Sequence, residues 1–219
     1  IADKILQEIN EMPKQGMVTR YYSPLENKIT IPHWDMFRET TYQAFTYLNH
    51  GFLDIIYKMT NISDLKPDIG LHGGGVHFHP TGGNLNLHKD YSIHPKLGMM
   101  RKLNLIIYMN PIWQDDWHGH LEFWSHDKKN NAPKECKIKI LPKFNRAVLF
   151  DVSQDGWHGL PTHTRQPNDI YRQSMAIYYM TEPKNDIEIR PKALFAPRED
   201  QQNNDEIQEL IIKRSGMVN

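Results

Sequence analysis

Apolar residues recur at helical spacing near both ends of the chain. Residues 2–11 and 34–59 carry aliphatic and aromatic side chains three and four positions apart, which places them on one face of an α-helix. Residues 204–216 show a further helical pattern, and Gly216 stands where a helix commonly stops. The sequence therefore predicts supporting helices at the N-terminal end and one more helix near the C-terminus.

Between these regions the pattern changes to short runs rich in Ile, Val, Phe and Tyr, interrupted by Gly, Pro and Asn. Runs of this kind are typical of β-strands separated by turns. Several short strands at such spacing favour a β-sandwich or barrel, so we expect a mainly β protein with flanking α-helices. The eight runs are residues 74–80, 84–90, 102–110, 119–127, 136–143, 146–153, 155–161 and 172–180.

The overall charge is balanced, with 26 acidic and 26 basic side chains in 219 residues. No block of like charge forms a nucleic-acid-binding arm, so composition argues against a nucleic-acid partner. The single cysteine, Cys136, cannot form an intramolecular disulfide, which favours a reducing, cytoplasmic location. No apolar run reaches the roughly 20 residues that cross a bilayer, so no membrane partner is expected. The first residue is Ile1, so further sequence could precede it.

A histidine and an aspartate stand two residues apart in the run NLNLHKDYSIHP, at His88 and Asp90. Alternate residues of a β-strand point to the same face, so both side chains can reach one point. His158 follows another apolar run, 70 residues after His88, and intervening strands can bring it back. Two imidazoles and one carboxylate form the facial triad of non-haem Fe(II) oxygenases. Catalytic zinc commonly uses a helical HExxH motif, which is absent, so iron is the expected metal.

Arg172 opens the last strong strand pattern, 14 residues after His158. A buried guanidinium in such a site calls for an anion, and its planar fork suits a carboxylate. Two alternatives stay open from the residues alone. Arg172 can be an ordinary arginine at a strand end, and Arg165, in a polar loop, competes as the anion partner.

The order of a His-x-Asp pair, a distant histidine and an arginine on the final core strand resembles the 2-oxoglutarate and Fe(II)-dependent dioxygenases. Within them it resembles the prolyl 4-hydroxylase-like group. This resemblance implies that His88, Asp90 and His158 hold iron and that Arg172 binds the distal carboxylate of 2-oxoglutarate. It implies that all four residues act in catalysis.

Two further residues take roles from the same resemblance. Ser174 resembles the serine or threonine that assists the arginine, and Tyr108 resembles the tyrosine that donates its hydroxyl to the same carboxylate. The stretch WHGHLEFW resembles the family's Gly-Gly-x-Leu strand, but His120 replaces the second glycine.

The resemblance also implies the fold and the reaction. The fold is a single domain over 1–219 with a double-stranded β-helix, or jelly-roll, core over 68–183, helical support over 1–67 and an extension with a helix over 184–219. The cofactors implied are Fe(II), 2-oxoglutarate and O2, with ascorbate as a reductant in vitro. The chain would convert 2-oxoglutarate to succinate and hydroxylate an unactivated C–H bond.

The substrate is a more open question, because one scaffold serves many substrates. A proline in a peptide or protein is the leading candidate substrate, because the sequence resembles prolyl hydroxylases. A small molecule such as a free amino acid, metabolite or sugar is the alternative. From another class, the chain could be a non-catalytic metal-binding β-barrel module, although such a module has no use for the pair Arg172 and Tyr108. The oligomeric state is left open.

Two further histidines and four tryptophans have simpler explanations than a role in the reaction. His77 and His79 alternate as His88 and Asp90 do and could hold a second metal, but hydrogen-bonding histidines in the wall of the substrate site are the commoner case. Four tryptophans near the core strands favour packing over substrate stacking, and Trp157 can shield His158.

Overall fold

The computed structural model describes residues 1–16, 18–152, 155–185 and 188–216. Ser153, the last residue of one predicted strand, lies outside this part. The helices are α1 (Ala2–Asn10), α2 (Glu39–Asn49), α3 (Leu53–Thr60) and α4 (Asp205–Ser215), with 3-10 turns at Trp34–Met36, Asp115–Trp117 and Glu199–Gln201. The strands are β1 (Thr19–Ser23), β2 (Glu26–Ile31), β3 (Lys66–Pro67), β4 (Gly75–His79), β5 (Asn84–Lys89), β6 (Met100–Tyr108), β7 (Leu121–Asp127), β8 (Ala132–Ile140), β9 (Ala147–Asp151), β10 (Trp157–Leu160), β11 (Arg172–Thr181) and β12 (Leu194–Phe195).

Within the described residues, twelve strands form one curled antiparallel sheet in the order β8-β7-β10-β5-β2-β4-β11-β6-β9, with β1, β3 and β12 paired off this path. The strands β8 to β5 form one wall and the strands β4 to β9 form the other. β2 joins the walls, because it pairs with both β5 and β4. The curl leaves a cavity between the two walls. The expectation of a mainly β core flanked by helices is confirmed.

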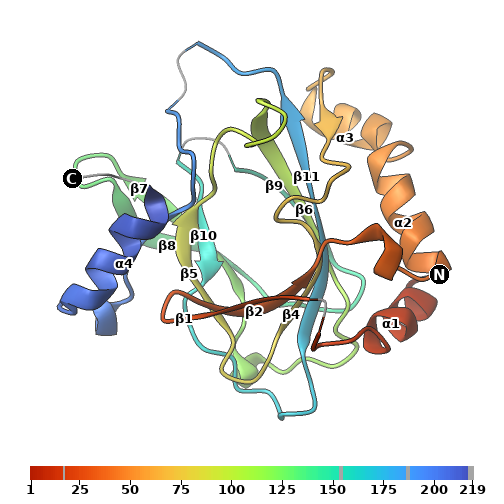
Figure 1. The fold of residues 1–219 in the computed structure, drawn as a ribbon, viewed down its shortest axis with the longest axis horizontal. Coiled ribbons are helices and arrows are strands. Elements are labelled where there is room, and N and C mark those ends of the chain that lie inside the picture. The colour runs from red at the N-terminus through yellow and green to blue at the C-terminus, as the bar shows by residue number, and fades with distance from the viewer. Residues whose placement is uncertain (17, 153–154, 186–187, 217–219) are drawn as a thin grey trace.

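Helices α1, α2 and α3 cover the outer face of β11 and β6, while α4 lies on the opposite side of the molecule (Figure 1). The main apolar core fills the layer between these three helices and the sheet and includes Ile9, Phe45 and Ile177. The hydroxyl of Tyr179 donates a hydrogen bond to the Leu48 carbonyl at 3.0 Å and so ties β11 to the end of α2. The N-terminal helices thus hold one wall of the sheet in place.

Strand β11 is buried along its whole length and divides its side chains between two environments. The odd-numbered residues from Met175 to Tyr179 belong to the core under the helices. The even-numbered residues from Arg172 to Tyr178 line a cavity between the two walls. Because strand side chains alternate between faces, one strand both anchors the core and supplies a site.

The C-terminal helix begins and ends as its sequence indicates. The Asn204 side chain accepts a hydrogen bond from the Ile207 amide at 3.2 Å, which satisfies an otherwise free donor of the first turn. Gly216 follows the helix with φ +71°, a left-handed conformation that glycine adopts without a steric penalty. The predicted helix over 204–216 is confirmed.

The sequence did not indicate the hairpin of β1 and β2, which lies inside the region expected to be helical support. The run of β2 has only Ile29 and Ile31 as apolar residues, too few for a strand signal. Its strand character depends on pairing with both walls of the sheet. Residues 34–59 also divide into two helices and a 3-10 turn, with Gly51 between α2 and α3. No helix among the described residues is long and apolar enough to cross a membrane.

Candidate metal centre and co-substrate pocket

The sheet brings His88, Asp90 and His158 together in the cavity. His88 lies on β5, Asp90 follows that strand directly, and His158 on β10 pairs opposite His88. One possible ligand atom from each residue lies within 4.8 Å of the others. The Nε2 atom of His88 is 3.7 Å from Asp90 Oδ1, and that of His158 is 3.8 Å from Asp90 Oδ2. All three side chains are buried, so the three donors converge away from bulk water.

The backbone orients both imidazole rings. His88 Nδ1 lies 2.9 Å from the Asn86 carbonyl, and His158 Nδ1 lies 2.9 Å from the Gly156 carbonyl. A carbonyl only accepts, so each Nδ1 is the donor, and each Nε2 is turned toward Asp90. Burial and the neighbouring His158 lower the pKa of His88 to about 4, so its ring is neutral at neutral pH. A neutral imidazole oriented in this way is a competent metal ligand.

Asp90 supplies the negative charge that a divalent cation needs. Burial raises the pKa of its carboxyl, but His158, Arg101 and His88 lower it more strongly together, and the net shift is downward. Its Oδ2 atom is buried and has no hydrogen-bond partner among the described residues. A buried carboxylate oxygen without a partner is costly unless a cation binds it. The residues present therefore fit a divalent metal ion.

This is the one cluster of three or more His, Cys, Asp and Glu side chains with metal-binding geometry in the part of the chain that the structure describes. His77 and His79 line the same cavity but belong to no second cluster. The alternative of a second metal there is therefore not supported.

Arg172 and Tyr108 meet at one end of the cavity. The Arg172 guanidinium donates to the Tyr108 hydroxyl at 3.3 Å and to the Gly119 carbonyl at 2.7 Å. Ser174 pairs opposite Tyr108 across β11 and β6 and lines the same cavity. Burial lowers the pKa of Arg172 and raises that of Tyr108. No carboxylate of the described residues forms an ion pair with this guanidinium, so it is available for an anionic ligand.

The competing residues lie elsewhere. Arg165 is exposed, as expected from its polar loop. His120 hydrogen-bonds to Asp115 at 3.0 Å in a neighbouring surface pocket. Gly119 adopts φ +71°, and a Cβ atom there would come 3.2 Å from Arg172 Cδ. Thr164 and Trp113 lie closer still, at 3.0 and 3.1 Å, so a glycine at position 119 suits both this backbone conformation and the close packing around it.

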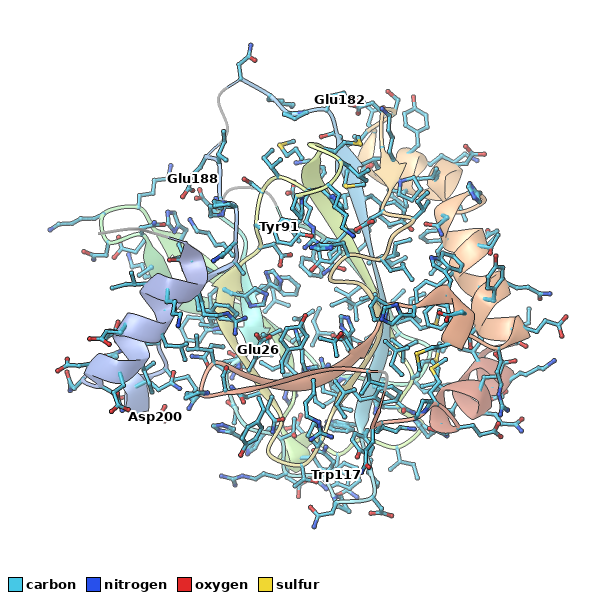
Figure 2. The ribbon with its side chains drawn as sticks, in the orientation of Figure 1. Glu26, Tyr91, Trp117, Glu182, Glu188 and Asp200 are labelled. Atoms are coloured by element: carbon cyan, nitrogen blue, oxygen red, sulfur yellow. The ribbon has the colours of Figure 1, made fainter. Side chains whose placement is uncertain are left out.

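One cavity of about 420 Å³ contains both groups of residues. It is lined by His88, Asp90 and His158 in one wall and by Arg172 and Ser174 in the other. Figure 2 shows Glu26 and Tyr91, which also line it, in the space between α4 and β11. A metal ion and a dicarboxylate can thus occupy one continuous space.

Arg101 is a site residue that sequence reasoning did not single out. It is buried at the start of β6, its Nη1 lies 3.9 Å from Asp90 Oδ1, and it donates to the His72 carbonyl. The available signal was a basic residue at the head of an apolar strand run, which more commonly marks an exposed strand end.

Comparison with known proteins identifies the class. Residues 74–180 match the model of the 2OG-Fe(II) oxygenase superfamily. No curated protein sequence matches the chain.

Solved structures share the fold at low sequence identity. A Trichoplax adhaerens prolyl hydroxylase in complex with a hypoxia-inducible-factor peptide fragment matches with TM-score 0.53 and 16% identity, over 82% of this chain and 78% of that one. A Pseudomonas putida prolyl-4-hydroxylase matches with TM-score 0.54 and 16% identity, over 84% and 88%. HygX from Streptomyces hygroscopicus, with nickel and 2-oxoglutarate bound, matches with TM-score 0.55 and 13% identity, over 92% and 84%.

Residues 74–180 match the 2OG-Fe(II) oxygenase superfamily, a class of dioxygenases that use Fe(II) and 2-oxoglutarate. Within that class the chain is prolyl 4-hydroxylase-like in fold. The predicted jelly-roll core, enzyme class and cofactors are confirmed, and the non-catalytic binding module is set aside. The roles of individual site residues stay predictions that the geometry is consistent with.

Proposed function

We propose that the chain hydroxylates a proline in a peptide or protein, with His88, Asp90 and His158 holding Fe(II). Arg172, Tyr108 and Ser174 bind 2-oxoglutarate. The observation that carries this proposal is that the histidine–aspartate triad and Arg172, which donates a hydrogen bond to the Tyr108 hydroxyl, line one cavity. Two prolyl hydroxylases among the similar structures support proline as the substrate.

When bound, the iron and 2-oxoglutarate supply the oxidising chemistry, in which O2 converts 2-oxoglutarate to succinate and CO2 and hydroxylates a C–H bond. The protein binds, orients and shields these groups. Asp90 and the Nε2 atoms of His88 and His158 would hold the metal ion. The buried guanidinium of Arg172 binds the distal carboxylate.

A polar small molecule is the second candidate substrate. HygX has been solved with nickel, 2-oxoglutarate and hygromycin B bound, which makes a compact polar substrate compatible with this fold. In the present chain the cavity is also lined by Glu26, Lys28, Lys192 and Arg214, and such charges suit a polar molecule as well as a peptide.

Two further proposals concern the cellular location of the protein and its division into domains. We propose a cytoplasmic location, supported by the free thiol of Cys136. We also propose that residues 1–219 act as a single oxygenase domain, with 68–183 as the catalytic core.

The test is succinate production from 2-oxoglutarate with Fe(II) and ascorbate under air. Turnover is measured alone, with proline-containing peptides and with polar small molecules. Stimulation by one peptide, with a mass increase of one oxygen on its proline, supports the leading proposal. Stimulation by a small molecule alone moves the assignment to the second candidate. Absence of any succinate from protein that binds Fe(II) contradicts both.

A further inference from the structure

His79 faces Arg172 at the end of the cavity where the guanidinium and Tyr108 meet. It is the last residue of β4 and pairs directly opposite Arg172 across the β4–β11 ladder. Side chains at such opposed positions on antiparallel strands are near neighbours. The side chain of His79 lines the same cavity, and the residue is only 3% exposed. Its position is therefore that of a deep wall residue beside the expected carboxylate site.

The ring of His79 has unmet hydrogen-bonding capacity. Neither Nδ1 nor Nε2 makes a hydrogen bond of normal geometry to any described group. The ring also has a polar contact with the Arg172 backbone that falls outside normal geometry and raises the pKa of His79. A neutral imidazole has one donor and one acceptor nitrogen, and neither nitrogen of His79 has a partner of normal geometry among the described residues. By contrast, His77, two residues earlier on the same face, has its Nε2 3.2 Å from the Gly74 carbonyl.

The surroundings of His79 select the kind of ligand. Burial first, and then the charges of Arg172 and Lys28 and the neighbouring His77, hold its pKa well below the ordinary 6.5. The ring is therefore neutral and keeps one N–H to donate. No carboxylate forms an ion pair with His79 or Arg172 among the described residues. A donor beside an uncompensated guanidinium suits an anionic acceptor.

We propose that His79 is a further co-substrate-binding residue, whose N–H donates to the distal carboxylate of 2-oxoglutarate beside Arg172 and Tyr108. This inference rests on the proposed role of Arg172 and Tyr108 in binding the distal carboxylate. His79 would then help to select a 2-oxo dicarboxylate over 2-oxo acids that lack the second carboxylate. A lost hydrogen bond to a charged group corresponds to a loss of affinity of about tenfold or more.

The experiment compares two ligands of the Co(II)-loaded protein. One is 2-oxoglutarate, and the other is 2-oxopentanoate, which keeps the keto acid but ends in a methyl group. Dissociation constants are measured by calorimetry without O2 for the wild type, His79→Leu, His79→Phe and His79→Gln. His77→Leu is the matched control on the same strand face. Thermal unfolding and Co(II) affinity are recorded for each variant, and having two donor-free substitutions keeps the test usable if one fails to fold.

We expect His79→Leu and His79→Phe to weaken 2-oxoglutarate about tenfold or more and to leave 2-oxopentanoate nearly unchanged. His79→Gln, which keeps a donor, should recover part of the affinity, and His77→Leu should preserve the ratio between the ligands. Unchanged 2-oxoglutarate affinity, or an equal loss for both ligands, would overturn the proposal.

Arg172→Gln separates this inference from the assignment on which it rests. If Arg172→Gln abolishes the preference for 2-oxoglutarate and the His79 variants do not alter it, only the role of His79 fails. If the wild type itself shows no preference for 2-oxoglutarate, the role of Arg172 as the partner of the distal carboxylate fails, and the role of His79 fails with it.

Discussion

The guanidinium of Arg101 lies 3.9 Å from Asp90 Oδ1 and is held flat between two tyrosine rings. Its Cζ atom is 3.6 Å from the centroid of Tyr91 and 3.5 Å from that of Tyr178. Stacking on both faces fixes the plane of the guanidinium, and the charge of Arg101 lowers the pKa of Asp90. Arg101 thus orients the carboxylate of the candidate metal centre without being a ligand itself.

Arg101→Met should weaken metal binding, because it removes the charge beside Asp90 and keeps an apolar stem between the tyrosines. Residues that orient metal ligands typically contribute about 10–100-fold in affinity. Co(II) titration, followed by the visible absorption of the bound ion, measures the effect. The control is Lys102→Met, because Lys102 pairs with Asp151 near the surface. A folded Arg101→Met protein with unchanged Co(II) affinity would show that Arg101 does not support Asp90.

Arg172→Ala should cost about 2–5 kcal/mol of 2-oxoglutarate binding, as in truncation of one member of a buried charge pair. Calorimetry on the Co(II)-loaded protein measures this loss. Arg165→Ala, a change at an exposed arginine of a nearby loop, is the control. If both variants bind 2-oxoglutarate as the wild type does, Arg172 is not the carboxylate partner.

Gly159→Ala should disturb the metal centre through the backbone. A Cβ atom at Gly159 would lie 2.7 Å from the carbonyl oxygens of both Leu85 and Asn86, and the Asn86 carbonyl orients His88. The substitution forces β10 away from β5, at a cost of about 1–3 kcal/mol for overpacking. We expect lower thermal stability together with weaker Co(II) binding.

The control for this change is Gly70→Ala. A Cβ atom there meets only Asp68 Oδ1, at an ordinary 3.4 Å. If Gly159→Ala binds Co(II) as tightly as the wild type does, the metal centre does not require the close approach of β10 and β5.

Glu26 should give the protein a stability that depends on pH. Burial raises the pKa of its carboxyl, but Lys28 and Arg214 lower it more, so the net pKa lies below the ordinary 4.5. A depressed folded-state pKa adds stability above the unfolded pKa, and this stability is lost as the pH falls through the folded pKa. Because Arg214 is partly exposed, Glu26→Gln should cost only about 1–3 kcal/mol at neutral pH.

Urea unfolding of the wild type and Glu26→Gln at a series of pH values measures this contribution. The difference between the two proteins should be constant near neutrality and shrink as the pH falls below about 4.5. A difference that does not change with pH would mean that the charge of Glu26 is not its source.

The sequence by itself determined the local elements and the chemistry. Strand alternation put His88 and Asp90 on one face, the apolar runs marked the core strands, and Gly216 marked the end of the last helix. These features depend on residues close together in the chain, where backbone geometry fixes the spacing of side chains.

Only the tertiary structure decided which distant residues meet. The register of β10 on β5 puts His158 opposite His88, and that of β4 on β11 puts His79 opposite Arg172. The hairpin strand β2 and the placement of Arg101 beside Asp90 likewise depend on contacts between segments far apart in the sequence. Pairing across a curled sheet is set by long-range packing and hydrogen bonding, and the residue pattern of one strand does not identify the strand with which it pairs.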